Sequence, residues 1–544
     1  MKRSFPVIAL LMLLISSCND HASETTASPG QEKNPSGKKM TSRDGSINAS
    51  NAYNNIFFDS LVLVKFITDQ KLDDSLAMRL TSFYNARNYQ LAWFTENGLT
   101  EQARGFWNLQ NYRDDSSFVD KALKQKMDAY TEETDSFTVS VADKEIMSTE
   151  LKLTLQFIRY ILHEYEKGYV KRKEMERFIP VKKEDPLALA DSLLAKKHKD
   201  DKYYEEVNKA YGALKQQLGK YAAIQKQGGW QRISSTAKQL KKGSSSPAIV
   251  QVKKRLFLSG DMAADTLPVY NDALEEGVRN FQVRHGYKPT GIITDSLIAD
   301  MNVPVTDRIK QILVNMNRMQ WMINEPAGQM IMVNIPEFIF YLKDGDKDIF
   351  SMNVVVGKDG HNTMMFTGDL SQVVFSPYWN VPPSIVSKEI LPAMHRNGNY
   401  LASHHMEIVG NRGGIPVIRQ LPGPWNSLGR VKFLFPNSFN IYFHDTPAKD
   451  LFEKDKRAFS HGCIRLSDPA KLANYLLKDD GQWPPEKIDS AMNSGKEKFV
   501  ALKKTIPVLI TYYTAWVDEQ GRLHFADDIY GHDKAIMQKM FAGR

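Results

Sequence analysis

The spacing of apolar residues changes near residue 328, and this change constrains the fold more than any other feature. Upstream, apolar side chains recur every three to four residues, as between Leu151 and Leu162, which is typical of helices that pack through one face. Downstream they alternate, as between Ile331 and Ile335, which is typical of strands. One side-chain period does not suit the other element. We therefore predict a multidomain α+β protein with a helical N-terminal part and a β-rich C-terminal domain.

The length and composition indicate a globular protein of several domains. A chain of 544 residues exceeds what one hydrophobic core usually organises, and 42% hydrophobic with 25% charged residues is typical of folded proteins. The net charge of +8 would suit an anionic polymer. Because 71 basic residues are nearly balanced by 63 acidic ones, spread along the chain, we interpret the charge as a solvated surface. We expect a monomer without a nucleic-acid partner.

Each of the two cysteines, Cys18 and Cys463, needs its own explanation, because a disulfide would have to join the extreme N-terminus to the C-terminal domain. Residues 7–15 form an apolar run behind Lys2 and Arg3 that is too short to span a bilayer comfortably. The run ends in Ile-Ser-Ser-Cys, which resembles the lipobox of bacterial lipoproteins. The resemblance implies that residues 1–17 are a signal peptide and that Cys18 carries a lipid. An ordinary signal peptide with a chance cysteine is the alternative.

The segment after the lipobox is expected to link the anchor to the folded part. Residues 18–52 are rich in Ser, Asn, Gly, Lys and Pro, which predicts a flexible tether behind the lipidated cysteine. A lipoprotein of this kind would sit at the periplasmic face of the cell envelope, on the inner or the outer membrane. Residues 53–240 show helical spacing without a catalytic constellation, so we predict a helical scaffold domain there. A stretch rich in Gly and Ser, 228–247, is suited to a linker.

Residues 248–303 are predicted to form a small helical module. One helix ends in Phe281-Gln282, and a turn at Gly286 and a short loop at Thr290-Gly291 follow before the last helix. This pattern resembles the three-helix peptidoglycan-binding module, although the aspartate-glycine loop usual in that module is shorter here. A plain helical linker domain is the alternative.

The β-rich part of the chain contains a cysteine and a histidine with a spacing suited to nucleophilic catalysis. Cys463 lies in the octet 459–466, Phe-Ser-His-Gly-Cys-Ile-Arg-Leu, and His444 lies 19 residues earlier. A thiol nucleophile needs a nearby base because free cysteine is mostly protonated at neutral pH. Gly462 permits a tight turn, and the amides of Gly462 and Cys463 could hold an oxyanion. Arg465 offers a planar fork for a carboxylate.

The octet resembles the signature of the L,D-transpeptidase family with a YkuD-type catalytic domain. That signature is a histidine, about 14–17 residues, then Ser/Thr-His-Gly-Cys with Arg or Asn two positions after the cysteine. Asp445 departs from the glycine that many members carry there, but it is found in a YcbB-like branch of the family. Segments 333–336, 354–358, 377–385, 428–433 and 514–518 are similar to that branch as well.

The resemblance implies an enzyme that acts on peptidoglycan stem peptides. Cys463 would attack the carbonyl before the terminal D-Ala of a tetrapeptide, and a neighbouring amine would take over the acyl group to give a 3→3 crosslink. Carbapenems would acylate the same thiol. His444 would be the base, and Ser460, His461 and Gly462 would shape the pocket and oxyanion site. The candidate substrate contacts are Arg465, Tyr442, Trp379 and Asn380.

The same resemblance gives the catalytic domain as residues 328–544, with a capping subdomain at 386–427. We expect no cofactor and no metal, because His404 and His405 have no evident third ligand. Trp379 and Asn380 could equally serve the fold. Crosslinking, D-amino-acid exchange, carboxypeptidase trimming and attachment of another protein all remain open as outcomes of one acyl-enzyme.

Two other functions are compatible with parts of this pattern. A non-catalytic lipoprotein could bind peptidoglycan through residues 248–303 alone. A papain-like Cys/His endopeptidase of the cell wall would place its cysteine before its histidine, and only His524 and His532 follow Cys463. The order of Cys463 and His444 therefore argues against the papain-like arrangement.

Overall fold

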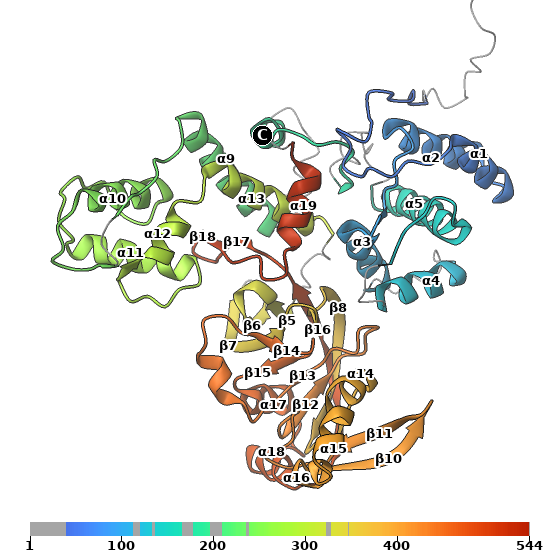
Figure 1. Cartoon of the computed structure of the whole chain (residues 1–544), viewed down its shortest axis with the longest axis vertical. Coiled ribbons are helices and arrows are strands. Elements are labelled where there is room, and N and C mark those ends of the chain that lie inside the picture. The colour runs from blue at the N-terminus through green and yellow to red at the C-terminus, as the bar shows by residue number, and fades with distance from the viewer. Residues whose placement is uncertain are drawn as a thin grey trace, which may run out of the picture.

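The computed structural model describes residues 40–112, 120–132, 137–165, 178–195, 209–235, 239–321, 328–345 and 347–542. Helices of the N-terminal part form one lobe, a small helical module forms a second, and a large sheet with its helices forms a third (Figure 1). Helices α9, α13 and α19 lie where the three lobes meet (Figure 1). The predicted multidomain α+β fold is confirmed.

The scaffold lobe is built around a cluster of aromatic side chains. Trp93 stacks on Phe106 (ring centroids 5.5 Å apart), and Phe157 meets both rings edge-on. Trp321 joins them from more than 150 residues further along the chain, so the lobe closes only when that distant segment docks. Its elements are α1 (Ser60–Asp69), α2 (Asp74–Ala86), β1 (Phe94–Thr95), β2 (Gly98–Leu99), α3 (Glu101–Tyr112), α4 (Lys121–Glu132) and α5 (Lys144–Tyr165).

Part of the segment predicted to be a flexible tether is packed against the scaffold. Ile47 and Ala52 are buried together with Val181, and Tyr53 donates its backbone N–H to the Val181 carbonyl (3.0 Å). The polar composition of residues 18–52 concealed these two apolar anchors because their partner lies about 130 residues away in the sequence. Residues 1–39, including the predicted signal peptide and Cys18, lie outside the described residues.

A second helical core lies between the lobes. Its helices are α7 (Pro186–Leu194), α9 (Lys209–Lys226), α13 (Val305–Met319) and α19 (His532–Met540), and the hairpin β17 (Ala515–Val517) and β18 (Leu523–Phe525) packs on them. The span 53–240 therefore contributes to two cores rather than one. Most of the segment after about residue 514, predicted as part of the catalytic domain, packs in this central core, whereas Ile529 and Tyr530 pack against the core of the large sheet. Helix α13 is buried on nearly all sides, which explains why both ends of the chain converge on it.

The small module contains α10 (Pro247–Ser259), α11 (Asp272–Arg284), α12 (Asp295–Met301) and the short strands β3 (Gln239–Leu240) and β4 (Ile293–Thr294). The contacts of Gln282 explain why this module combines a helix that ends in Phe-Gln with a Thr-Gly loop. The side-chain amide accepts from the Gly291 N–H (2.9 Å) and donates to the Ile292 carbonyl (3.0 Å), so the end of α11 fixes the Thr-Gly loop. Arg284 forms a buried ion pair with Asp261 (2.6 Å).

The third lobe, which holds most of the segment predicted as catalytic domain, contains a nine-stranded sheet in the order β14-β7-β15-β13-β12-β8-β16-β5-β6, in which β6 also pairs with β7 and so curls the sheet back on itself. The alternating apolar residues predicted this sheet, and they fill its core on one face. The strands are β5 (Gln329–Asn334), β6 (Ile339–Asp344), β7 (Lys347–Gly357), β8 (Phe366–Phe375), β12 (Val431–Leu434), β13 (Phe443–His444), β14 (Ala458–Ser460), β15 (Ile464–Leu466) and β16 (Lys498–Thr511). The helices are η1 (Ile335–Glu337), η3 (Lys449–Glu453), α17 (Pro469–Leu477) and α18 (Pro485–Met492).

The segment predicted as a capping subdomain projects from this lobe (Figure 1). It has its own three-stranded sheet, in the order β10-β11-β9, and a small apolar core. Its elements are β9 (Trp379–Asn380), α14 (Pro383–Ile385), η2 (Val386–Ile390), α15 (Leu391–Arg396), α16 (Tyr400–Ser403), β10 (Met406–Arg412) and β11 (Ile415–Gln420). Among the described residues, no helix combines the length and the apolar character needed to cross a membrane.

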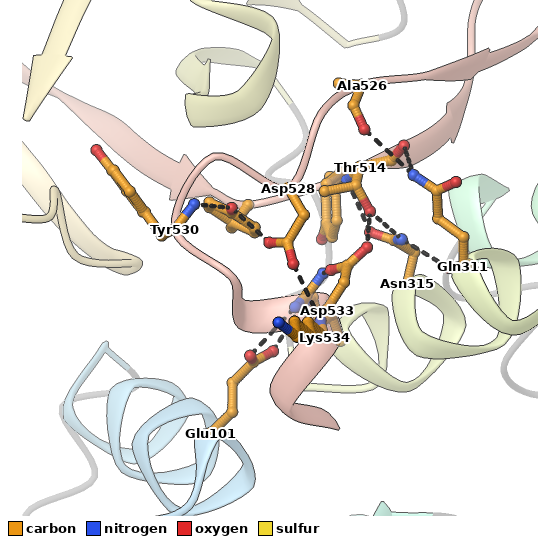
Figure 2. Close-up of polar contacts among 12 residues, drawn as sticks. Glu101, Gln311, Asn315, Thr514, Ala526, Asp528, Tyr530, Asp533 and Lys534 are labelled. Carbon is orange, nitrogen blue, oxygen red and sulfur yellow. Dashed lines mark hydrogen bonds and ion pairs between the residues drawn. The ribbon is translucent and has the colours of Figure 1, made fainter. Parts of the chain in front are cut away.

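A buried polar network joins the scaffold lobe, α13 and the C-terminal helix (Figure 2). Arg318 of α13 bonds Glu101 of α3 (2.6 Å) and also Asp533 of α19. Asp533 accepts a hydrogen bond from Thr514, which is held in turn by Asn315 (2.8 Å). A buried guanidinium is tolerated only when it is paired in this way, so the network fixes the three elements in one arrangement.

Candidate active site

The register of two strands brings the signature residues onto one face of the sheet. Strand β13 pairs in parallel with β15, so that Phe443 lies opposite Ile464 and His444 lies opposite Arg465. Phe443 and Ile464 are both buried in the core of the sheet. Because successive side chains of a strand point to opposite faces, their neighbours, Tyr442, His444, Cys463 and Arg465, face away from that core.

The turn before Cys463 is held by the hydroxyl of Ser460. Gly462 has φ +111°, a conformation that side chains rarely adopt. The Ser460 hydroxyl donates to the Cys463 carbonyl (2.6 Å) and accepts from the Gly462 N–H (3.2 Å). The Gly462 amide, predicted as an oxyanion donor, is therefore already engaged. The Cys463 N–H has no acceptor among the described residues, which leaves it as the better candidate.

The environment of the Cys463 thiol favours its neutral form. Burial raises the pKa of the thiol, while hydrogen bonds from Tyr442 and the charge of Arg465 oppose this rise. The sulfur also lies 3.8 Å from the Asn440 carbonyl oxygen, to which a thiol can donate. Burial raises the pKa of Tyr442 as well, and the neighbouring thiol adds to the rise, so the phenol keeps its proton and serves as a donor.

The histidine predicted as base has a tautomer suited to that role. Its Nδ1 lies 2.5 Å from the Asp445 carbonyl oxygen, which can only accept a hydrogen bond. The proton must therefore sit on Nδ1, and Nε2 carries the lone pair. Burial, followed by the charge of Arg465, lowers the pKa of His444 to about 3. The ring is thus neutral at neutral pH and able to accept a proton. Tyr442 lies beside it, with the ring centroids 5.8 Å apart.

Asp445, the departure from the commoner glycine, has a structural partner in Gly429. The Asp445 carboxylate accepts from the Arg430 backbone N–H (2.9 Å) and pairs with Lys449 (2.7 Å). Gly429 has φ +61°, and a Cβ there would lie 2.3 Å from Asp445 Oδ2. The aspartate thus occupies the space that Gly429 leaves open, and it ties the end of β13 to the turn at residues 426–430.

His461 points to the capping subdomain. Its Nε2 lies 2.9 Å from Glu389 Oε1 of η2, and its ring lies 4.8 Å from that of His361. Neither Glu389 nor His361 was a sequence candidate, because nothing local in the sequence links them to the signature. The described contacts do not bring Trp379 or Asn380 to Cys463. Trp379 packs in the core of the capping subdomain, and both residues pair with β11.

Lys432 is a further residue of this face that sequence reasoning missed. Strand β12 places it directly opposite His444, and its side chain is only 14% exposed. Burial lowers the pKa of Lys432, and the nearest carboxylate, on Glu497, is 3.8 Å away. His444 therefore lies between two cations, Lys432 and Arg465, an arrangement suited to an anionic group. The alternation Val-Lys-Phe at 431–433, which is typical of a strand with Lys432 on the face away from the core, was the signal in the sequence that could have identified it.

The other histidines considered from the sequence lie elsewhere. His524 bonds Asp518 (2.7 Å) in the β17–β18 hairpin, and His532 packs on Tyr512. His404 donates from Nδ1 to the Tyr400 carbonyl oxygen (2.8 Å), on the surface of the capping subdomain. Within the described part of the chain, no group of three or more His, Cys, Asp or Glu side chains is placed to hold a metal ion.

Comparison with known families agrees with this architecture. Residues 328–498 match the family described as the L,D-transpeptidase catalytic domain, YkuD, and residues 78–218 match the scaffold domain family. The chain therefore carries a YkuD-type L,D-transpeptidase catalytic domain over residues 328–498 and a scaffold domain over residues 78–218. The assignment of residues 248–303 to a peptidoglycan-binding module and the YcbB-like branch stay predictions.

Individual relatives are similar over parts of the chain. A protein of Haemophilus influenzae named "Putative L,D-transpeptidase" is 35% identical over 223 residues, which is 38% of this chain and 45% of the relative. This chain thus spans about half the length of that relative. An L,D-transpeptidase from Mycobacterium smegmatis is 15% identical, with 35% of this chain and 61% of that chain covered and a TM-score of 0.20. One from Stackebrandtia nassauensis is 14% identical, with 51% and 97% covered and a TM-score of 0.20.

Proposed function

We propose that the protein is a cysteine L,D-transpeptidase that acts on peptidoglycan stem peptides. The observation that carries the proposal is the shared sheet face of Cys463, Tyr442, His444 and Arg465, with the His444 lone pair on Nε2. The match to the YkuD-type catalytic domain supports the reaction class.

The first half of the reaction forms a thioester. The Cys463 proton passes to His444 Nε2 as the sulfur attacks the carbonyl between the diamino acid and D-Ala of a tetrapeptide stem. The Cys463 N–H stabilises the oxyanion that forms, a contribution typically of about 10²–10³ in rate. The tetrahedral intermediate collapses, the C–N bond breaks, and the imidazolium returns the proton to the amine of the leaving D-Ala.

The second half transfers the acyl group. The side-chain amine of a neighbouring stem attacks the thioester, an amide forms, and the thiol is restored with the proton that the amine gives up. The product is a 3→3 crosslink and the enzyme is unchanged. Lys432 and Arg465, on either side of His444, are suited to bind a carboxylate of the stem peptide and so to hold the scissile carbonyl at Cys463.

The experiment is incubation of the purified protein with disaccharide-tetrapeptides, followed by mass spectrometry of the products. We expect free D-Ala and 3→3 dimers from the wild type, and neither from the matched variant Cys463→Ala. Intact-mass measurement after incubation with a carbapenem should show one covalent adduct that Cys463→Ala lacks. Dimers formed by Cys463→Ala would refute the assignment of the nucleophile. A non-catalytic peptidoglycan-binding protein would give no adduct and no dimer.

We also propose that the mature protein is anchored by a lipid on Cys18, at the periplasmic face of the inner or outer membrane. The sequence supports this through the basic n-region, the short apolar run and the lipobox-like tetrad. Labelled fatty acid should be incorporated into the wild type and not into Cys18→Ala, which should leave the membrane fraction. Equal labelling of the two proteins would contradict the anchor.

A further inference from the structure

The turn at residues 460–463, which we call the catalytic turn, accepts hydrogen bonds at two of its backbone carbonyl groups from the loop that follows β7. Lys358 donates its backbone N–H to the Ser460 carbonyl (2.9 Å), and the Thr363 hydroxyl donates to the Gly462 carbonyl (2.8 Å). The same hydroxyl accepts a hydrogen bond from the Gly357 N–H (2.9 Å). Thr363 is buried, so its hydroxyl is committed to these two backbone partners.

A second layer of contacts fixes the position of Thr363. The Tyr530 hydroxyl accepts from the Thr363 N–H (3.3 Å) and donates to the Gly357 carbonyl (2.6 Å). A Cβ on Gly357 would lie 2.0 Å from the His361 carbonyl oxygen, so only glycine allows the loop to close this tightly. The Thr363 hydroxyl is thereby held at one place relative to the catalytic turn.

The group that Thr363 holds is the peptide group before the nucleophile. The Gly462 carbonyl and the Cys463 N–H belong to one planar trans peptide, in which they point in opposite directions. A hydrogen bond that fixes the carbonyl therefore also fixes the direction of the N–H. A restraint is needed here because the glycine on one side of this peptide resists rotation of the backbone less than any other residue.

We propose that Thr363 is a positioning residue, which orients the Cys463 N–H as the donor to the oxyanion. It touches neither substrate nor thiol, and it acts through the Gly462 carbonyl alone. The inference rests on the proposed transpeptidase function, because only acyl transfer develops the oxyanion that this N–H would stabilise.

The test compares two reactions of the same thiol. Acylation by a carbapenem passes through an oxyanion, whereas alkylation by iodoacetamide is a displacement at carbon that develops none. Thr363→Val keeps the shape of the side chain and removes both hydroxyl hydrogen bonds. We expect its acylation rate to fall about 10²–10³-fold, the typical cost of losing one oxyanion donor, while its alkylation rate stays within twofold of the wild type. Thr363→Ser, which keeps the hydroxyl, should recover most of the acylation rate.

The matched control is Thr511→Val, because Thr511 is a buried threonine at the end of β16 in the same lobe, and its hydroxyl donates to the Val333 carbonyl (3.3 Å). It should leave both rates near the wild-type values. Equal loss of acylation and alkylation in Thr363→Val, or acylation within threefold of the wild type, would overturn the proposal.

A crystal structure of Thr363→Val separates this proposal from the function on which it rests. We expect the Gly462 carbonyl to turn from its wild-type direction, and with it the Cys463 N–H. An unchanged peptide would overturn the positioning role. A turned peptide in a protein whose wild type takes no carbapenem and makes no dimer would support the role of Thr363 in fixing this peptide and refute the transpeptidase assignment.

Discussion

The hydroxyl of Tyr442 is the contact most open to a quantitative test. It is hydrogen-bonded to Cys463, and this bond lowers the pKa of a thiol that burial raises. Tyr442→Phe removes the bond and keeps the ring beside His444. A hydrogen bond to a charged group contributes about 1.5–3 kcal/mol, and each 1.4 kcal/mol is about a factor of ten. The thiolate population below the thiol pKa should therefore fall roughly ten- to a hundredfold.

The assay is the rate of iodoacetamide alkylation across pH 6 to about 10, since only the thiolate reacts. The profile of Tyr442→Phe should be displaced to higher pH, with the same limiting rate once the thiol is fully ionised. Tyr475→Phe is the matched control, because the Tyr475 hydroxyl accepts from Gln329 (2.8 Å) in the same domain without touching the site. Superimposable profiles of Tyr442→Phe and the wild type would refute the argument that this hydroxyl stabilises the thiolate.

Three further outcomes are expected. The rate of carbapenem acylation at pH 7 should fall about 10²–10⁴-fold in His444→Ala and recover partly near pH 9.5, where the thiolate forms unaided. The rate of His461→Ala should not recover at alkaline pH. The reverse pattern would exchange the roles of the two histidines. Burial lowers the pKa of His444 to about 3, so between pH 6 and 4 the unfolded state binds a proton that the folded state does not. In urea titrations the wild type should therefore lose about 1.4 kcal/mol of stability per pH unit over this range relative to His444→Gln. Parallel pH dependences of the two proteins would contradict the burial of His444. Asp533→Ala should lower the free energy of unfolding by about 3–5 kcal/mol because Arg318 loses a buried carboxylate, against about 0–1 kcal/mol for Asp69→Ala at an exposed ion pair.

The parts of the fold that depend on local pattern could be predicted from the sequence. The alternation around Phe443 and Ile464 predicts strands, and the same alternation places His444 and Cys463 on the side away from the core. The helix after Asp468 could also be predicted, because an aspartate followed by a proline is a common helix start; in the structure Asp468 accepts from the Lys471 N–H and Pro469 lies in the first turn. These features require only neighbours in the sequence, which is why they are visible without the structure.

The contacts that complete the site are long-range and could not be predicted in this way. Glu389 meets His461 from 72 residues away, and Thr363 meets Gly462 from 99 residues away. Lys432 looks like an ordinary surface lysine of an alternating strand until its register with His444 is known. For the same reason the boundaries of the helical cores were not visible, since α13 collects partners from both ends of the chain.

The C-terminal segment connects the junction of the lobes to the catalytic turn through its backbone and side chains. Asp533 is tied to Arg318, and Arg318 to Glu101 of the scaffold lobe. Three residues before Asp533, Tyr530 bonds the loop that holds the Gly462 carbonyl. A shift of the scaffold lobe that moved this segment would therefore reach the peptide before Cys463 through packed, hydrogen-bonded groups. The scaffold lobe is thus connected to the catalytic turn through Arg318, Asp533 and Tyr530. This connection gives a reason why charged residues far from Cys463 are buried in pairs.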